Sequence, residues 1–306
     1  MSTIGDLGEF GLIGRLTRRL RPGRAVRLGP GDDAAVIAAP DGRVVATTDL
    51  LVEGRHFRRD WSGPYDIGRK AAAQNLADVV AMGARPTALL VGFAAPLSTP
   101  AAWAERLYDG LDDECRAAGA SVAGGDLVGA PEVTLAVTAL GDLGGEPPIT
   151  RSGARPGDVV AVRGRLGYSA AGMRLLAEGR DGPAELIEAH RRPQPPYAAG
   201  EEARALGATA LLDVSDGLLQ DLGHIAAASG VRIEVDSRAV PVPAILGADG
   251  PRHVLTGGED HAFAGTFPAD TVLPPSWSPV GVVAEGAGVL LDGREPEVAG
   301  WDHFRA

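Results

Sequence analysis

The stretch LLDVSDGLLQDLGHIAAA, residues 211–228, joins a short apolar run to a longer helical one through an acidic turn. Its first four residues are typical of a buried strand, and its last twelve have apolar side chains at helical spacing. Alternation along the strand places Asp213 and Ser215 on one face. Ser215 or Asp216 can cap the helix, whose N-terminus attracts anions. Capping would explain those two residues but not Asp213, so the stretch predicts a strand-to-helix turn with a further role.

Short strands and helices also alternate through the rest of the second half of the chain. A helix is predicted over residues 168–177, where small and apolar side chains recur at helical spacing. Strands are predicted where β-type apolar runs lie between turn residues. These runs are residues 158–163, 233–235, 262–267 and 280–283.

The first half shows the same alternation. Helices are predicted over residues 7–20, 66–82 and 101–118. Strands are predicted over residues 34–38, 44–48, 89–94, 121–123 and 133–139. The first two of these strands are expected to form a hairpin, because a Pro-Asp-Gly turn separates them. Alternation in both halves predicts an α/β (α+β) protein with two domains.

The domain boundary is predicted near the middle of the chain. At 306 residues with 45% hydrophobic content, the chain can bury two ordinary cores or one large one, and two domains are the default. Residues 144–148, GGEPP, combine flexible and helix-incompatible residues and are the best linker. We therefore expect an N-terminal domain over residues 1–148 and a C-terminal domain over residues 149–306.

The composition argues against several classes of protein. A net charge of −11 argues against a nucleic-acid binder, which needs a basic face. Lys70, the only lysine, does not belong to a P-loop, and no strand leads into the glycine pattern of a Rossmann site. No apolar run is long enough for a membrane span or a signal peptide, so we expect a cytoplasmic protein. The single Cys115 excludes an intrachain disulfide and a thiolate metal cluster, and we interpret it as a buried hydrophobe.

Acidic residues recur beside glycines or at strand ends, and most have an ordinary explanation when taken singly. Residues 29–33, GPGDD, are typical of a solvated turn. Thr47 and Asp49 lie on one strand face and offer the hard oxygen ligands that Mg²⁺ prefers, although an ordinary strand end is the alternative. A lone histidine such as His56 is more often structural than functional.

Three further clusters strengthen the pattern. Asp78 lies in a helix that otherwise looks buried, where a carboxylate is costly unless it is paired or bound to metal. Gly125 precedes Asp126 and would let a phosphate or a metal approach the backbone closely. Residues 257–260, GGED, repeat the order of glycine before acid. Together the clusters predict a site where divalent cations separate carboxylates from bound phosphates.

The ordered set of motifs resembles the thiamine-monophosphate kinase family, whose superfamily also holds aminoimidazole ribonucleotide synthetase and selenophosphate synthetase. The motifs are GPGDDAA, TTDLLVEGRHF, NLADVVAMGA, GGD, TRSGARPGD, DVSDGL and TGGED. They lie between residues 8–10 and residues 301–304, so the resemblance covers practically the whole chain. It implies an aminoimidazole ribonucleotide synthetase-like fold, transfer of the ATP γ-phosphoryl group to thiamine monophosphate, and a homodimer formed through the N-terminal domains.

The resemblance also implies which residues form the site. Several Mg²⁺ ions would be held by Asp33, Thr47, Thr48, Asp49, Asp78, Asp126, Asp213 and Asp216. ATP would be held by Tyr108, Gly125, Asp126, Arg151 and Ser215. Thiamine monophosphate would be contacted by His56, Glu259 and the ring of Trp301. No general base is expected, because a phosphate monoester is mostly ionised at pH 7 and supplies its own nucleophile.

One departure and two alternatives accompany this hypothesis. His261 follows GGED where the family often has tyrosine, which affects packing beside Glu259. ATP-dependent ring closure of a ribonucleotide is the alternative within the superfamily. Selenophosphate synthesis is disfavoured, because the only cysteine, Cys115, is not near the N-terminus. A sensor that binds nucleotide or thiamine phosphate without turnover is the alternative from another class.

Overall fold

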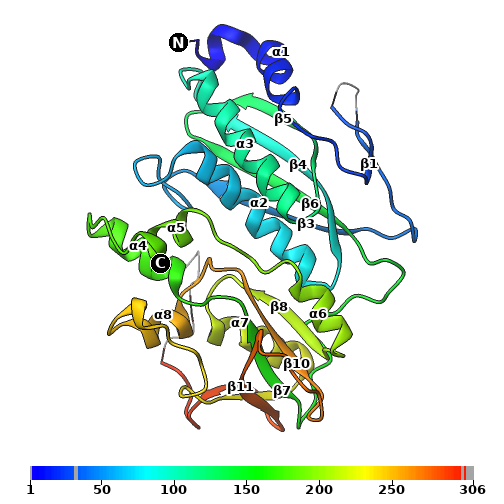
Figure 1. Cartoon of the computed structure of the whole chain (residues 1–306), viewed down its shortest axis with the longest axis vertical. Coiled ribbons are helices and arrows are strands. Elements are labelled where there is room, and N and C mark those ends of the chain that lie inside the picture. Colours follow the sequence, from blue (N-terminus) through cyan, green and yellow to red (C-terminus); the bar gives the residue numbers. More distant parts are fainter. Residues whose placement is uncertain (1, 31–33, 298–299, 301–306) are drawn as a thin grey trace. The chain divides into compact units, whose positions relative to one another are not determined.

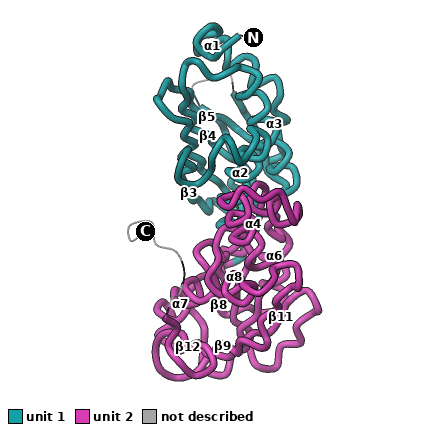
Figure 2. Tube along the Cα trace, turned by 90° about the vertical axis from the view of Figure 1, so that its left-hand side faces the viewer, with its two compact units in different colours: residues 1–79, 84–146 teal, residues 80–83, 147–306 magenta. Residues whose placement is uncertain are grey.

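The structure is a computed structural model, and it describes residues 2–30, 34–297 and 300. Helices and sheets occur throughout the chain (Figure 1), which confirms the predicted α/β class. The chain divides into two compact units, which are coloured separately in Figure 2. Unit 1 comprises residues 1–79 and 84–146, and unit 2 comprises residues 80–83 and 147–306. Within the described residues, no helix combines the length and the apolar character that a bilayer span requires.

Unit 1 contains a four-stranded sheet and three helices. The helices are α1 (Ile4–Thr17), α2 (Pro64–Ala81) and α3 (Ala101–Ala117). The sheet has the order β3 (Val45–Val52), β6 (Thr134–Asp142), β4 (Arg85–Ala95) and β5 (Val122–Gly129). On β6, Leu135, Val137 and Ala139 are buried while their neighbours are only partly so. One face of the sheet therefore packs into the core, and β3 and β5 form its two edges.

Helices α2 and α3 pack with their backbones in direct contact. A Cβ atom at Gly68 would lie 2.0 Å from the carbonyl oxygen of Leu107, and one at Gly110 would lie 2.1 Å from that of Tyr65. Glycine in a helix usually lowers its stability, but here only glycine permits the close approach. The crossing fixes α2, which in turn positions the polar side chains that face β3.

The expected hairpin between residues 34–38 and 44–48 is wrong. β2 (Val36–Ile37) pairs antiparallel with β1 (Val26–Leu28), and the two form a separate small sheet. β3 instead pairs with β6 along its whole length, from Val45 to Val52. The local turn signal was real, but the long β6 strand offers β3 eight paired residues and a buried face, which a short hairpin cannot match.

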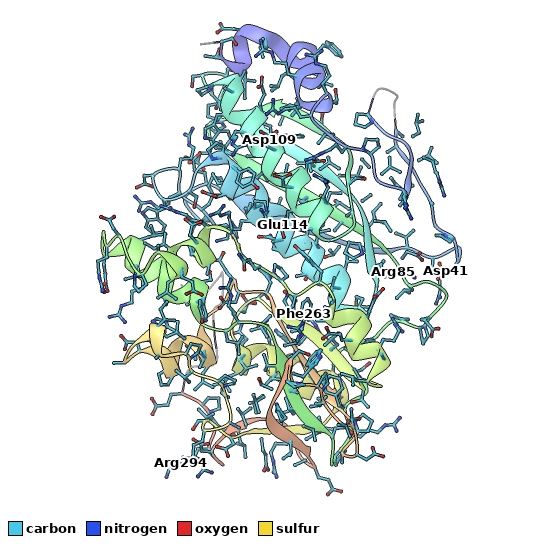
Figure 3. All side chains as sticks on the ribbon, in the orientation of Figure 1. Asp41, Arg85, Asp109, Glu114, Phe263 and Arg294 are labelled. Carbon is cyan, nitrogen blue, oxygen red and sulfur yellow. The ribbon has the colours of Figure 1, made fainter. Side chains whose placement is uncertain are left out.

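Unit 2 is built on a six-stranded sheet. The strands follow the order β12 (Gly288–Leu291), β9 (Arg232–Val235), β11 (Trp277–Ala284), β7 (Val159–Arg163), β10 (Ala262–Phe267) and β8 (Ala210–Val214). The helices are α4 (Tyr168–Ala177), α5 (Ala184–Arg191), α6 (Ala199–Ala205), α7 (Leu218–Ser229), α8 (Gly250–Thr256) and the short η1 (Ala244–Leu246). The predicted bounds of α4 and β10 are confirmed. Phe263, labelled in Figure 3, is fully buried on β10 between β7 and β8.

Candidate functional site

Strand β3 and helix α2 of unit 1 bring three of the predicted site residues together. Thr47 and Asp49 are half-buried and alternate with exposed residues on β3, so they share one face, as predicted. The Thr47 hydroxyl donates to Asp78 Oδ2 on α2 at 2.9 Å. Asp78 is only half-buried, whereas its helical neighbours Leu76, Ala77 and Val79 are fully buried. The arrangement gives a small group of oxygen ligands that is open on one side.

Asn75 holds this group in place, although sequence reasoning gave it no role. Its side-chain oxygen accepts the Asp49 backbone N–H at 3.1 Å, and its Nδ2 donates to the Ala71 carbonyl at 2.9 Å. Asn75 is fully buried, so both hydrogen bonds are shielded from water. The sequence signal that could have identified it is a polar amide among apolar helical residues, one turn before Asp78. Asn75 thereby fixes the β3 backbone at the point from which Asp49 projects.

The other β3 residues take separate positions. The Thr48 hydroxyl donates to the Val137 carbonyl at 3.0 Å and receives a bond from Thr138 Oγ1 at 3.2 Å, on the opposite face from Thr47 and Asp49. The structure therefore does not bring the Thr48 side chain together with those two. His56 lies in the turn after β3, where its Nδ1 accepts the Val52 N–H at 3.1 Å. That bond leaves Nε2 as the protonated nitrogen of the neutral ring.

Gly125 and Asp126 lie on the other edge strand, β5. A Cβ at Gly125 would be 2.0 Å from the Val91 carbonyl oxygen, so the position requires glycine. Asp126 is exposed and pairs in register with Gly92 on β4. Three strand spacings separate β5 from β3, or about 14 Å. Within one copy of unit 1, Asp126 and Asp49 therefore lie at opposite edges of the sheet.

Tyr108 lies on α3 and is almost completely buried. Its ring meets Phe93 edge-on, with 6.3 Å between the ring centroids. Burial raises the pKa of Tyr108 well above its usual value, and the charge of Asp126 adds to the shift. The phenol is therefore neutral, and it lies close enough to Asp126 to feel its charge. Tyr108 is accordingly near β5, the strand that carries Asp126, and not near β3.

In unit 2, the turn between β8 and α7 is organised by Asp221, a residue that sequence reasoning missed. Asp221 Oδ2 accepts the backbone N–H groups of Ser215, Asp216 and Gly217 at 3.0–3.1 Å. The expectation that Ser215 or Asp216 caps the helix is wrong, because Gly217 is the N-cap residue and glycine has no side chain with which to cap. Burial raises the pKa of Asp221 to about 7, even though the three N–H bonds favour the charged form.

Asp221→Ala should destabilise the protein by about 2 kcal/mol, because three N–H groups, one buried and two partly buried, lose their acceptor. Asp221→Asn keeps an acceptor oxygen and should lose less. The measurement is the free energy of unfolding in urea, with exposed Asp270→Ala as the control in the same unit. Equal stability of Asp221→Ala and the wild type would remove this role from Asp221.

Residues 257–261 lie directly on the 213–217 turn. The Glu259 N–H donates to the Ser215 carbonyl at 2.8 Å, and the His261 N–H donates to that of Val214 at 3.1 Å. Glu259 and His261 both have positive φ, 64° and 52°, which is uncommon for non-glycine residues. A backbone held in this conformation by long-range hydrogen bonds is typical of functional loops. Ser215 and Glu259 are thus brought together.

His261, the departure from the family pattern, pairs with a predicted metal ligand. Its Nδ1 and Asp213 Oδ2 are 3.0 Å apart, and both side chains are buried. Next to it, buried Asp260 accepts the N–H groups of Gly167 and Ser169 at 2.7 and 2.8 Å, which ties the loop to the start of α4. Burial raises the pKa of Asp260 to about 7. The packing beside Glu259 is therefore fixed by two buried acids.

The backbone of residues 150–151 contacts the start of β8 and the end of α7, away from the turn that joins them. The Arg151 carbonyl accepts from the Ser229 hydroxyl at 3.1 Å, and the preceding Thr150 carbonyl accepts the Leu211 N–H at 3.2 Å. Leu211 is four residues from Ser215 along an extended chain, or about 13 Å. The structure thus places the Arg151 and Ser215 backbones apart within unit 2.

Two predicted residues, Asp33 and Trp301, lie outside the described residues. Among residues 2–30, 34–297 and 300, no three His, Cys, Asp or Glu side chains gather closely enough to hold a metal ion by themselves. Oxygen atoms do come together at β3 and α2. They belong to the Thr47 hydroxyl and the Asp78 carboxylate, and Asp49 lies on the same strand face as Thr47. This donor chemistry fits Mg²⁺, which usually keeps several waters and binds one or two carboxylates together with substrate phosphates.

Family models match both units. The model for the N-terminal domain of AIR synthase related protein matches residues 31–143, and that for the C-terminal domain matches residues 155–257. The chain is 51% identical to a thiamine-monophosphate kinase of Mycobacterium tuberculosis, over 99% of this chain and 93% of the relative. It is 42% identical to the Corynebacterium glutamicum enzyme of the same name, over 99% and 95% of the two chains.

Solved structures agree with these matches. The crystal structure of thiamine-monophosphate kinase from Stenotrophomonas maltophilia superposes with a TM-score of 0.81 and 34% identity, covering 93% of this chain and 95% of the other. The structure of AaThiL complexed with AMPPCP and TMP also gives a TM-score of 0.81, with 33% identity over 99% of both chains. The chain therefore belongs to the thiamine-monophosphate kinase family of AIR synthase related proteins.

Proposed function

We propose that this protein phosphorylates thiamine monophosphate with ATP, giving thiamine diphosphate and ADP. We also propose that it acts in the cytoplasm. The proposal rests on 51% identity to a thiamine-monophosphate kinase over 99% of this chain. The solved structure of a relative, AaThiL, complexed with AMPPCP and TMP supports both substrates. Residues 1–148 would hold nucleotide and metal, and residues 149–306 would complete the site.

The acidic residues of both units would serve as the metal-binding part of the site. Asp49, Asp78 and the Thr47 hydroxyl form the group at β3 and α2, with Asp33 and Asp126 added from elsewhere in the N-terminal half. Asp213 and Asp216 would be the ligands from unit 2. Thr48 would act through its main chain, because its hydroxyl is bonded on the other face of the sheet. When bound to these oxygens, Mg²⁺ supplies the positive charge that lets two phosphate groups approach each other.

The remaining residues would position the two substrates. Ser215, Gly125, Asp126, Tyr108 and Arg151 would hold ATP. The backbones of Ser215 and Arg151 lie apart on unit 2, so these two residues would contact different parts of the nucleotide. His56, Glu259 and Trp301 would contact thiamine monophosphate. Positioning and charge neutralisation account for the chemistry, since the acceptor phosphate is itself the nucleophile and needs no general base.

We further propose a homodimer formed through unit 1. Seven large apolar side chains of unit 1 are exposed, against four of unit 2, among the described residues. Leu50 on β3 and Val128 on β5 are 56% and 62% exposed, and each lies on an edge strand of the sheet. Exposed apolar residues on unpaired edge strands favour association with another chain. Light scattering should therefore give the mass of two chains.

The dimer would also complete the metal site. Two carboxylates on one Mg²⁺ ion lie within about 4 Å of each other, since each oxygen is about 2.1 Å from the metal. Asp49 and Asp126 of one copy lie on strands about 14 Å apart, so they cannot share an ion. In a closed two-fold dimer the β5 edge of one copy can lie beside the β3 edge of the other. We propose that Asp126 completes the site of the partner.

The direct test is incubation of the purified protein with ATP, Mg²⁺ and thiamine monophosphate, followed by separation of the products. We expect thiamine diphosphate and ADP in equal amounts, and no product when EDTA removes the metal. Binding of both substrates without ADP would instead identify a sensor. A superfamily enzyme that closes a ribonucleotide ring would leave thiamine monophosphate unchanged.

A further inference from the structure

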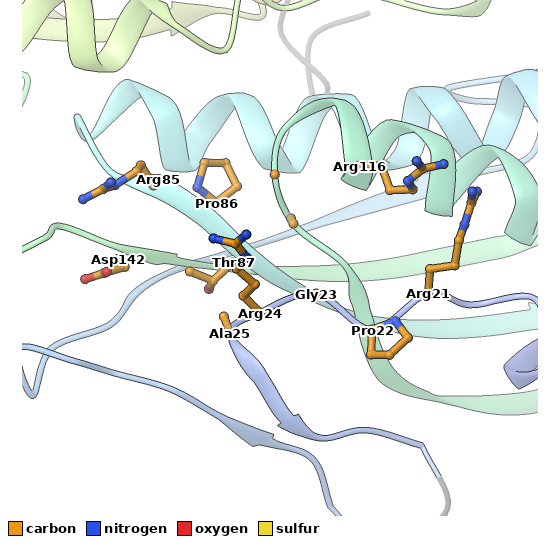
Figure 4. Close-up of a pocket in the computed structure, with 12 residues that line it drawn as sticks. Arg21, Pro22, Gly23, Arg24, Ala25, Arg85, Pro86, Thr87, Arg116 and Asp142 are labelled. Atoms are coloured by element: carbon orange, nitrogen blue, oxygen red, sulfur yellow. The ribbon is translucent and has the colours of Figure 1, made fainter.

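Unit 1 contains a cavity of about 690 Å³ that the proposed kinase site does not use (Figure 4). Its walls come from the segment after α1, the start of β4, the end of α3 and the last residue of β6. Four arginines line it, namely Arg21, Arg24, Arg85 and Arg116, against one carboxylate, Asp142. This is a concentration of positive charge in a chain with a net charge of −11. The cavity therefore gathers positively charged side chains within an acidic chain.

Two of the four guanidinium groups are available to a ligand. Arg21 is already paired with Asp112 at 2.6 Å and with Asp113 at 3.0 Å. By contrast, Arg24 and Arg116 are exposed and form no ion pair or side-chain hydrogen bond with any other residue that the structure describes. Figure 4 shows both side chains at the cavity. Their positive charge is thus not neutralised by neighbouring carboxylates.

The cavity is well separated from the acidic group on β3 and α2. Arg85 on β4 and Asp142 on β6 occupy opposite backbone positions at one end of the ladder between these two strands. Asp49 lies level with Val137 on β6, which is in turn level with Val91 on β4. Six residues of strand therefore separate the two rows, or about 20 Å. A ligand in the cavity would not overlap the carboxylates that are proposed to hold metal.

We propose that this cavity binds a small anion with two or more phosphate groups. Guanidinium groups bind phosphate oxygens in a bidentate manner, and their charge does not depend on metal. The volume lies in the range of small-molecule sites. Arg24 and Arg116 line the same cavity, so a ligand with two phosphate groups offers one group to each arginine. This inference is independent of the proposed kinase activity, because it rests only on unit 1 and its basic cavity.

The test is calorimetric titration of the full-length protein with inorganic pyrophosphate in EDTA. Without divalent metal, the acidic site repels anions, so binding reports the basic cavity. We expect one saturable site in the wild type. The double variant Arg24→Ala/Arg116→Ala should bind at least about tenfold more weakly, since both unpaired charges are lost. Arg18→Ala is the matched control, because Arg18 is exposed just after α1 and does not line the cavity.

Four results would overturn the inference. They are no saturable binding by the wild type, unchanged binding by the double variant, an equal loss in Arg18→Ala, and equal binding of citrate, which would show that phosphate is not selected. Both arginines are exposed, so their replacement should leave folding intact, and circular dichroism of the double variant verifies this. Turnover plays no part in the readout, so failure here would leave the kinase proposal unaffected.

Discussion

Asp49→Asn should cut turnover at saturating ATP and thiamine monophosphate by at least about tenfold, equivalent to about 1.4 kcal/mol in the barrier. The substitution removes a negative charge from the group formed by Thr47 and Asp78, and it preserves the size of the side chain. The backbone N–H of residue 49 still donates to Asn75, so the strand should stay in place. Steady-state kinetics over a range of Mg²⁺ concentrations are the measurement. We also expect half-maximal activity to require more Mg²⁺.

The matched control is Glu132→Gln, which removes one charge from an exposed residue between β5 and β6 of the same unit. This variant should keep the turnover of the wild type, because its side chain lies outside the proposed metal ligands. If purified Asp49→Asn turned over as fast as the wild type, the β3 carboxylate would have no part in the reaction. An equal loss in both variants would point to net charge and not to a specific ligand.

Elements with a local burial pattern could be predicted from the sequence. The stretch that runs from strand to helix in residues 211–228 is observed as β8 and α7, and α4 and β10 have the predicted bounds. Short helices such as α6, with seven residues, were not predicted, because so few residues give no clear periodicity. Strand pairing was also beyond local signals. The turn before β3 suggested a hairpin, whereas distant β6 supplied the partner.

The site shows the same division between local and long-range information. Strand alternation placed Thr47 and Asp49 on one face, and this is confirmed. Neither Asn75 nor Asp221 was assigned a role, because each acts by accepting backbone N–H groups, a contact that leaves no residue-type pattern. Asp213 and His261 are 48 positions apart, so their hydrogen bond could not be predicted from spacing. Sequence reasoning therefore supplied candidate ligands, which stay a prediction, but not the side chains that hold the backbone around them.

A heterodimer of Asp49→Asn and Asp126→Asn subunits should regain about half of the wild-type turnover, although each parent homodimer is nearly inactive. If Asp126 completes the partner's site, one of the two sites in this heterodimer has both carboxylates replaced and the other has neither. If Asp49 and Asp126 served the same copy, every site would have one defect. Co-expression with two different affinity tags and sequential purification yields the heterodimer for kinetic measurement.

The control heterodimer combines Asp49→Asn with Asp78→Asn. Thr47 beside Asp49 bonds Asp78 within one copy of unit 1, so these two positions belong to the same site and no combination of subunits restores it. This heterodimer should stay as inactive as its parents. Activity in the control but not in the Asp49–Asp126 pair would reverse the assignment of residues to subunits. The two pairs together therefore distinguish a site shared across the dimer, which we propose from the roughly 14 Å between the edge strands, from one built by a single chain.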